Sequence, residues 1–200
     1  LEGLFDLYVL VNTYDSANRT SIQTALNKLL PPNVFYLEVP YEDKIIRAKY
    51  AILSLRDLEV GTSPQWFHSY LWARFCQPTT MVYVRDEKVA EQVNHAFSQA
   101  VVTFVSRVLP RMPQEFTIRD LWSTGLALTY RSEFRPEQAD QQVRLFDARP
   151  DYFKEVTCRA FDGSPYQVKK IHNQESSLYS VIIPSSVRFL SRLTWALRIV

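Results

Sequence analysis

The residues best suited to chemistry lie between Ser63 and Pro78, in the segment SPQWFHSYLWARFCQP. Trp66, Tyr70 and Arg74 recur every four residues there, so they share one face if the segment is helical. We expect one helix, because Ser63 is a favoured capping residue and Pro78 is a stop signal. An arginine in line with aromatic side chains suits a phosphorylated ligand, since the guanidinium offers a fixed fork of donors. The alternative is an arginine whose stem covers apolar surface while its head reaches water.

Asp6 is a second candidate, because it interrupts the apolar, β-prone run Phe5–Val11. We expect this run to form a buried strand. A buried carboxylate is costly unless it is paired or binds a metal ion. Metal-dependent nucleotidyl transferases place such an aspartate on a strand, where it holds Mg²⁺ against a triphosphate. A strand-end aspartate in a salt bridge is the structural alternative.

Charged side chains on the neighbouring segments are candidates to complete such a site. Glu38, Glu42 and Asp43 offer a second carboxylate, or are solvated turn charges. Lys49 lies in the next expected strand, where it either counters phosphate charge or protects a sheet edge. The stretch TYRSEFR at 129–135 places two arginines around one glutamate, which builds either an anion pocket or a surface ion cluster.

Composition argues against several other kinds of site. The chain has only 4 glycines and contains neither GxxxxGK[ST] nor GxGxxG, so it lacks a glycine-rich phosphate loop. The histidines show no metal-ligand spacing, and the two cysteines, Cys76 and Cys158, lie far apart, which indicates a reducing compartment. No apolar run is long enough to span a membrane, and no signal peptide opens the chain. The chain starts without Met, almost directly in a strand, so we expect an upstream segment.

The hydrophobic pattern predicts an α/β or α+β chain, in the order β-α-β-β-α-β followed mostly by helices. Strands are expected at 5–11, 34–39, 45–53 and 81–84, and helices at 16–30, 63–76, 86–109, 117–129, 150–159 and 185–200. Thr117 and Asp120 form a capping box at the start of one helix. An Arg/Pro/Gln-rich loop is expected after Phe134.

The C-terminal segment is basic and amphipathic. From Ser164 to Val200, five lysines and arginines stand against Glu175 alone, which favours an anionic surface such as lipid headgroups, nucleic acid or a nucleotide. In the expected last helix the leucines form one side, and Arg188, Arg192 and Trp195 lie on the other. This helix either lies at a membrane interface, with Trp195 at the boundary, or packs its leucine side on the core.

In chain order, these segments resemble the mitochondrial-type phosphatidate cytidylyltransferases, the peripheral CDP-diacylglycerol synthases of the translocator assembly and maintenance family. The resemblance covers most of the chain through short elements with similar spacing. These elements are Phe5-Asp6-Leu7-Tyr8-Val9, Val34-Phe35-Tyr36, Lys49-Tyr50, the W-x3-Y-x3-R-x3-P pattern of Trp66, Tyr70, Arg74 and Pro78, Leu109-Pro110 with Leu128, Tyr130, Phe134 and Arg135, and Pro184-Ser185-Ser186-Val187-Arg188.

The resemblance implies transfer of CMP from CTP to phosphatidic acid, giving CDP-diacylglycerol and pyrophosphate, with Mg²⁺ as cofactor. This is a step of phospholipid and cardiolipin biosynthesis. The implied organisation is a nucleotidyltransferase-like mixed sheet with helices over 1–84, N-terminally incomplete, a winged-helix-like helical domain over 85–163, and a basic segment over 164–200. The implied location is peripheral, on the cytoplasmic or organelle-matrix side of a membrane, and no nucleic acid partner is expected.

The resemblance also implies roles for individual residues. Asp6 binds the metal and is catalytic together with Arg74, while Lys49, Tyr70 and Arg135 bind nucleotide or phosphate, and Arg188, Arg192 and Trp195 meet the headgroups of an anionic membrane. The chain departs from the family pattern at Gln77, at Trp72-Ala73 and at Ser132-Glu133, and it lacks the Gly-Ser signature before the Asp strand. Two other classes therefore stay open. One is a non-catalytic module of the same fold that binds nucleotide or an anionic membrane, and the other is a winged-helix nucleic-acid binder.

Overall fold

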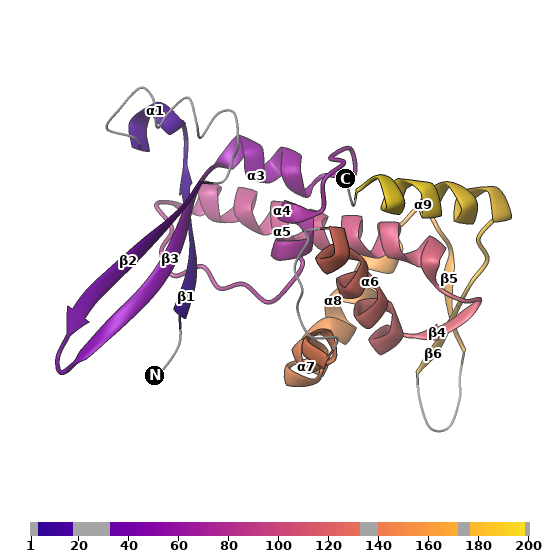
Figure 1. Ribbon diagram of the computed structural model, residues 1–200. Coiled ribbons are helices and arrows are strands. Elements are labelled where there is room, and N and C mark those ends of the chain that lie inside the picture. Colours follow the sequence, from indigo (N-terminus) through magenta and orange to yellow (C-terminus); the bar gives the residue numbers. More distant parts are fainter. Residues whose placement is uncertain (1–3, 18–32, 133–139, 172–176, 199–200) are drawn as a thin grey trace. The chain divides into compact units, whose positions relative to one another are not determined.

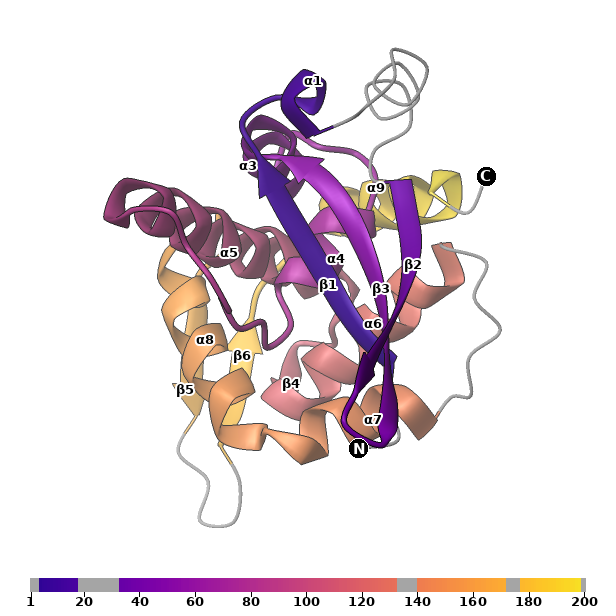
Figure 2. The same cartoon turned by 90° about the vertical axis from the view of Figure 1, so that its left-hand side faces the viewer.

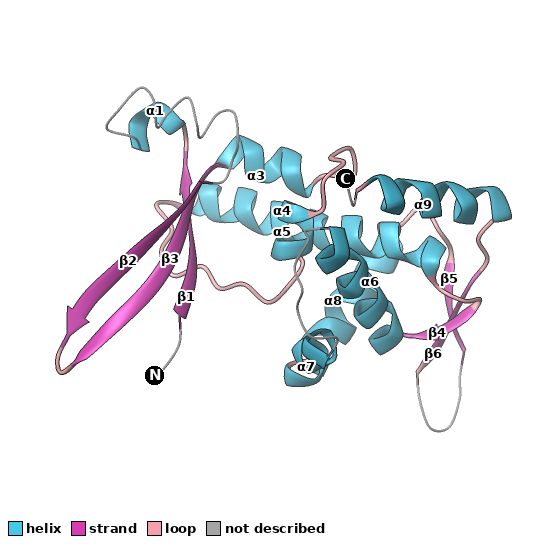
Figure 3. Cartoon of the chain, in the orientation of Figure 1, coloured by secondary structure: helices cyan, strands magenta, loops and turns pink. Residues whose placement is uncertain are grey.

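The computed structural model describes residues 4–17, 33–132, 140–171 and 177–198 (Figure 1). Helices and strands are mixed along the chain, and the strands form two separate three-stranded sheets (Figure 3). This is an α+β fold, as the hydrophobic pattern predicts. The chain divides into two compact units, Leu1–Val60 and Gly61–Val200. The division lies upstream of the predicted domain boundary between residues 84 and 85.

The first unit contains a sheet of three long strands, β1 (Leu4–Val11), β2 (Asn33–Tyr41) and β3 (Lys44–Ser54). β3 lies in the middle, parallel to β1 and antiparallel to β2 (Figure 2). All three strands are predicted correctly, because each contains a run rich in β-prone residues. A two-residue turn joins β2 to β3, with Glu42 at a φ of 51°.

The prediction that β1 is buried is wrong. Phe5 is 45% exposed, and Asp6 and Leu7 are also exposed. A continuous apolar run indicates a strand, but it does not say how many faces of the sheet are covered. Asp6 is therefore not a carboxylate removed from water, as a buried strand would require.

A short helix, α1 (Tyr14–Ala17), follows β1 and is anchored by a buried tyrosine. The Tyr14 hydroxyl donates a hydrogen bond of 2.5 Å to Asp57 Oδ2 and accepts one from the backbone N–H of Ser54. Ser54 caps the start of α3 (Leu55–Thr62), because its Oγ accepts from the Asp57 N–H at 3.0 Å. Residues 18–30 of the helix expected over 16–30 lie outside the described residues.

The second unit is mostly helical, with a small sheet. Its elements are α4 (Tyr70–Phe75), α5 (Glu87–Val108), the 3₁₀ turn η1 (Leu109–Arg111), β4 (Glu115–Thr117), α6 (Ile118–Ser132), α7 (Asp140–Ala148), α8 (Pro150–Asp162), β5 (Val168–Ile171), β6 (Leu178–Val181) and α9 (Ser185–Leu197). β6 pairs antiparallel with both β4 and β5. The order of elements in this unit is therefore helices, a strand, helices, two further strands and a last helix.

A stack of aromatic rings fills the core of the second unit. The rings of Phe104 and Trp122 are stacked at 4.3 Å, and that of Phe153 lies 4.5 Å from Trp122. All three side chains are fully buried, and the Trp122 indole N–H donates to Thr157 Oγ1 at 2.7 Å. Gly125 must be a glycine, because a Cβ there would lie 2.3 Å from the Phe104 ring. The ring of Trp122 is therefore buried while its indole N–H keeps a hydrogen-bond partner.

The helices of this unit agree with the sequence pattern better than its strands do. α5, α6, α8 and α9 are confirmed, and the Thr117–Asp120 capping box forms with reciprocal bonds of 3.0 and 3.1 Å. The strand expected at 81–84 is wrong, because this stretch is an exposed loop. α7 forms where a loop is expected after Phe134. The short strands β4, β5 and β6 were not predicted.

Candidate functional site

The polar face of the first sheet is built by strand register. Asp6 on β1 is opposite Lys49 on β3, and Lys49 is opposite Tyr36 on β2, so these three side chains share one face. The next row along the same face contains Arg47 and Glu38, whose Nε and Oε1 atoms are 3.0 Å apart. This pairing places an aspartate and a lysine, predicted as metal and phosphate ligands, side by side.

The carboxylates on this face are not equivalent. Glu38 accepts hydrogen bonds from the Tyr36 hydroxyl at 2.7 Å and from Arg47 Nε, and these bonds lower its pKa. Glu42 and Asp43 form the turn at the far end of the hairpin, where Tyr41 is opposite Lys44. Asp6 is therefore the carboxylate nearest to Lys49 by register.

The fit of this face to Mg²⁺ depends on a bound substrate. The described residues contain no group of three or more His, Cys, Asp or Glu side chains placed to hold a metal ion. Magnesium is commonly held by one or two carboxylates, with substrate phosphates and waters completing its octahedral shell. Asp6 supplies one such carboxylate, so the face fits Mg²⁺ only together with a polyphosphate.

The predicted phosphate-binding pair of the second unit lies on α4. The Arg74 guanidinium carbon lies 5.9 Å from the centroid of the Tyr70 ring, which places the cation over the aromatic face. Both side chains are half-buried, whereas Leu71, Trp72 and Phe75 on the same helix are buried. The four-residue spacing thus correctly predicts that Tyr70 and Arg74 lie together.

Trp66 does not share the face with Tyr70 and Arg74, because the helix starts only at Tyr70. The backbone carbonyls just before this helix accept hydrogen bonds from arginine side chains instead of from helical N–H groups. The carbonyls of Pro64 and Trp66 each accept from Arg107 Nη2 at 2.7 Å, and that of Phe67 accepts from Arg198 Nε at 2.7 Å. Charged donors from distant parts of the chain therefore hold residues 64–67 out of the helix that local signals favour.

The predicted site residues thus form two groups. Asp6 and Lys49 belong to the first compact unit, and Tyr70 and Arg74 belong to the second. The structure brings Asp6 to Lys49 and Tyr70 to Arg74. Arg135 lies outside the described residues.

α9 is oriented differently from both sequence-based interpretations. Trp195 is only 4% exposed, and its indole N–H donates to the Arg107 carbonyl at 3.3 Å. Arg188 donates through Nη1 to the carbonyls of Met112 and Pro110. The arginine and tryptophan side of the helix thus packs on the unit and satisfies carbonyls near the end of α5, which need partners. A position of Trp195 at a membrane boundary does not agree with this burial.

The leucine side of α9 faces outward instead of packing on the core. Its exposed apolar residues are Phe189, Leu190, Leu193 and Leu197, with 46% to 64% of each side chain accessible, and Arg192 is exposed beside them. In the part of the chain that the structure describes, no helix is long and apolar enough to cross a membrane. An apolar stripe with a flanking arginine is nevertheless typical of a surface-lying helix.

Sequence reasoning did not single out Arg107, and it counted Arg198 only among the basic residues of the C-terminal segment. Arg107 lies one turn from Phe104 on the inward side of α5, and Arg198 directly follows α9. An arginine three residues after a buried phenylalanine, within an apolar stripe, was the available signal. Comparison with known proteins adds no assignment, since no protein-family model matches the chain and no curated protein matches it.

Proposed function

We propose that this protein transfers CMP from CTP to phosphatidic acid, releasing pyrophosphate and forming CDP-diacylglycerol. The ordered resemblance of short elements to the phosphatidate cytidylyltransferases suggests the reaction. The observation that carries the proposal is the register pairing of Asp6 with Lys49 on one accessible sheet face. A carboxylate beside a cation is what a triphosphate with a divalent ion requires.

In the proposed reaction an oxygen of the phosphatidate phosphate attacks the α-phosphorus of CTP. The new P–O bond joins CMP to the lipid phosphate, and the bond to the β-phosphate breaks, so that pyrophosphate leaves. Mg²⁺, when bound through Asp6 and the triphosphate, supplies charge neutralisation. Lys49 balances the remaining phosphate charge. Arg74, whose guanidinium lies over the Tyr70 ring, and Arg135 stay predicted phosphate ligands.

A transfer assay tests this proposal. Labelled CTP, Mg²⁺ and phosphatidic acid in vesicles should yield lipid-soluble label, and Asp6→Asn should lower the rate about 100-fold. Arg74→Gln should lower it about 10-fold or more. The matched control is Asp151→Asn on α8, a carboxylate that is 97% exposed and pairs with Lys154, which should stay within about twofold. Absence of CDP-diacylglycerol with the unmodified, folded protein would end the proposal.

A second candidate function is non-catalytic docking on an anionic membrane, and the outward leucine side of α9 favours it. In this case the apolar stripe enters the headgroup region and Arg192 contacts anionic lipids. Vesicle flotation tests it. Leu193→Asp should abolish flotation with phosphatidic acid vesicles, while Lys154→Gln on α8 should leave it unchanged. Flotation without any nucleotide turnover would favour this candidate over the enzyme.

A further inference from the structure

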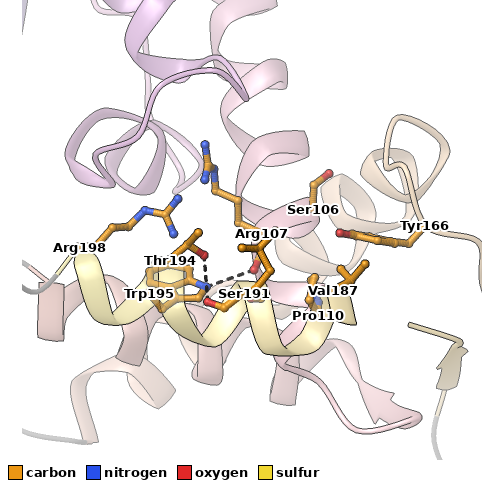
Figure 4. Close-up of a pocket in the computed structure, with 10 residues that line it drawn as sticks. Ser106, Arg107, Pro110, Tyr166, Val187, Ser191, Thr194, Trp195 and Arg198 are labelled. Carbon is orange, nitrogen blue, oxygen red and sulfur yellow. Dashed lines mark hydrogen bonds between the residues drawn. The ribbon is translucent and has the colours of Figure 1, made fainter. Parts of the chain in front are cut away.

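A cavity of about 170 Å³ lies between the end of α5 and the outer turns of α9, entirely within the second unit (Figure 4). This volume is far beyond the ~15 Å³ that one water molecule requires. Its lining is polar on one side and apolar on the other. The polar side includes Ser106, Arg107, Tyr166 and Arg198, and the apolar side includes Pro110 and Leu190.

Two arginines of this cavity carry charge that no acidic side chain balances. Arg198 is only 6% exposed, and Arg107 is half-buried. Neither forms a salt bridge with any carboxylate among the described residues. Their partners are the backbone carbonyls of residues 64, 66 and 67, which orient the two guanidinium groups but leave their charge in place. Buried cations without a counter-charge are rare in proteins, because desolvation disfavours them.

Part of the compensation comes from aromatic rings. The Arg198 guanidinium carbon lies 4.8 Å from the centroid of the Trp195 ring and 4.9 Å from that of the Phe67 ring. The Arg107 guanidinium carbon lies 5.6 Å from the centroid of the Trp72 ring. Cation–π contacts favour a cation, but they do not cancel the repulsion between two of them. Burial, and secondly the charge of Arg107, lowers the pKa of Arg198 to about 10.

Three donor groups at this cavity have no hydrogen-bond partner although they are buried. They are the Ser106 hydroxyl, Arg107 Nε and Arg198 Nη2. Figure 4 shows both guanidinium groups above Thr194 and Trp195, with the Tyr166 hydroxyl pointing toward Ser106. Residues that line a cavity and carry both buried unpaired donors and uncompensated positive charge favour an acceptor that is anionic and rich in oxygen.

We propose that this cavity is a binding site for a phosphate monoester, held by Arg107 and Arg198 with the Ser106 hydroxyl as a neutral donor. Guanidinium groups favour phosphate because their N–H donors match its oxygen spacing, and two of them match its double negative charge. The apolar wall formed by Pro110 and Leu190 accommodates an acyl or alkyl group attached to that phosphate. The site lies within the second unit and does not depend on nucleotidyl transfer.

Ligand-dependent stability tests the proposal without any nucleotide. The folded, full chain is titrated at constant ionic strength with inorganic phosphate, with dihexanoyl phosphatidate below its micellar concentration, or with dihexanoyl phosphatidylcholine, while Tm and tryptophan emission are recorded. A ligand that binds only the native state raises Tm in a saturable manner. We expect saturation with phosphate and with the phosphatidate, and no response to the phosphatidylcholine, which has no monoester.

The variants separate this site from general charge attraction. Arg198→Gln should weaken binding at least tenfold. Arg159→Gln, which removes an exposed charge from α8 of the same unit, should change it less than twofold. If Arg198→Gln does not fold, Ser106→Ala is the gentler variant, since the Ser106 hydroxyl has no partner to lose. It should weaken binding severalfold.

The two phosphate ligands also identify the source of the anion. Equal affinities would indicate a free phosphate or a small phosphorylated compound, and tighter binding of the phosphatidate would indicate a lipid phosphate. Either result supports the site. The proposal is overturned if neither compound gives a saturable response, or if Arg198→Gln and Arg159→Gln weaken binding equally.

Discussion

The two units of this chain bury their apolar side chains to very different extents. In the second unit the rings of Phe104, Trp122 and Phe153 are fully buried and in contact. In the first unit, apolar side chains remain exposed on both faces of the sheet, as Phe5 and Tyr36 illustrate. The difference indicates that the second unit is stabilised mainly by its core. The first relies more on strand pairing and a few specific contacts.

The same comparison holds for charged residues. On the sheet, positive and negative side chains are exposed and paired, as in Arg47 with Glu38. In the helical unit, Arg107 and Arg198 are withdrawn from water and bond to carbonyls. Exposed ion pairs contribute little to stability, whereas buried cations without a counter-ion are costly. The sheet therefore has an accessible polar face with paired charges. The helical unit has a cavity whose buried arginines favour a bound anion.

Replacing one phenylalanine by alanine in each unit tests this comparison with the largest expected effect. Phe104→Ala should lower the free energy of unfolding by about 3–5 kcal/mol, because it removes a fully buried ring from the aromatic stack. Phe5→Ala, at a side chain that is nearly half exposed, should cost about 1 kcal/mol. Denaturant unfolding with separate probes for each unit measures both. Equal losses would show that the sheet is as well buried as the core.

The next largest effect concerns the anchor of α1. Tyr14→Phe should cost about 2 kcal/mol, because Asp57 loses a buried donor and the Ser54 N–H loses its acceptor. Burial, followed by the bond to Asp57, raises the pKa of Tyr14 to about 12 from the usual 10.0.

The pH dependence provides the control for this anchor. A raised folded-state pKa means that the contribution of the tyrosine is complete below pH 10 and is lost as the pH rises toward 12. Unfolding monitored by far-UV circular dichroism should therefore show a decline over this range. In Tyr14→Phe, stability should decline less over this pH range. An unchanged slope would exclude Tyr14 as the source of the decline.

A smaller effect is expected at the capping box of α6. Asp120→Ala removes the acceptor of the Thr117 N–H and should cost about 1 kcal/mol. The loss should appear in the transition of the second unit alone. Glu115→Ala, an exposed acidic residue three positions before Ile118, is the matched control and should leave Tm nearly unchanged.

The smallest predicted effect is a gain at the turn of the β2–β3 hairpin. Glu42 has a φ of 51°, in the left-handed region that glutamate adopts poorly. Glu42→Asn should stabilise the first unit by about 0.5 kcal/mol, because asparagine tolerates this conformation at little entropic cost. Calorimetry measures the change in Tm. A lower Tm would mean that the glutamate has a role beyond the turn.

Local signals explain which elements could be predicted from the sequence. β1, β2 and β3 follow from β-prone runs, α5 from its 3.6-residue period, and the start of α6 from its capping box. The pairing of Tyr70 with Arg74 follows from helical spacing. Each of these features depends on residues close in sequence, so its physical cause is visible without a structure.

The features that could not be predicted depend on distant residues. The helix expected from Ser63 is shortened by hydrogen bonds from Arg107 and Arg198, which belong to α5 and the end of α9. The orientation of α9 depends on which carbonyls need donors, not on its own amphipathic pattern. Similarly, the register that places Asp6 opposite Lys49 emerges only from the pairing of two strands.

The central proposal is that Asp6 and Lys49, which are opposite each other in the register of β1 and β3, act on the same nucleotide. A double-mutant cycle on binding of Mg²⁺–CTP, measured by calorimetry with Asp6→Asn, Lys49→Gln and the double variant, tests this most directly. Two residues that share one ligand should show a coupling energy of about 1 kcal/mol or more. Additive effects of the two substitutions, or unchanged binding in either single variant, would contradict the account.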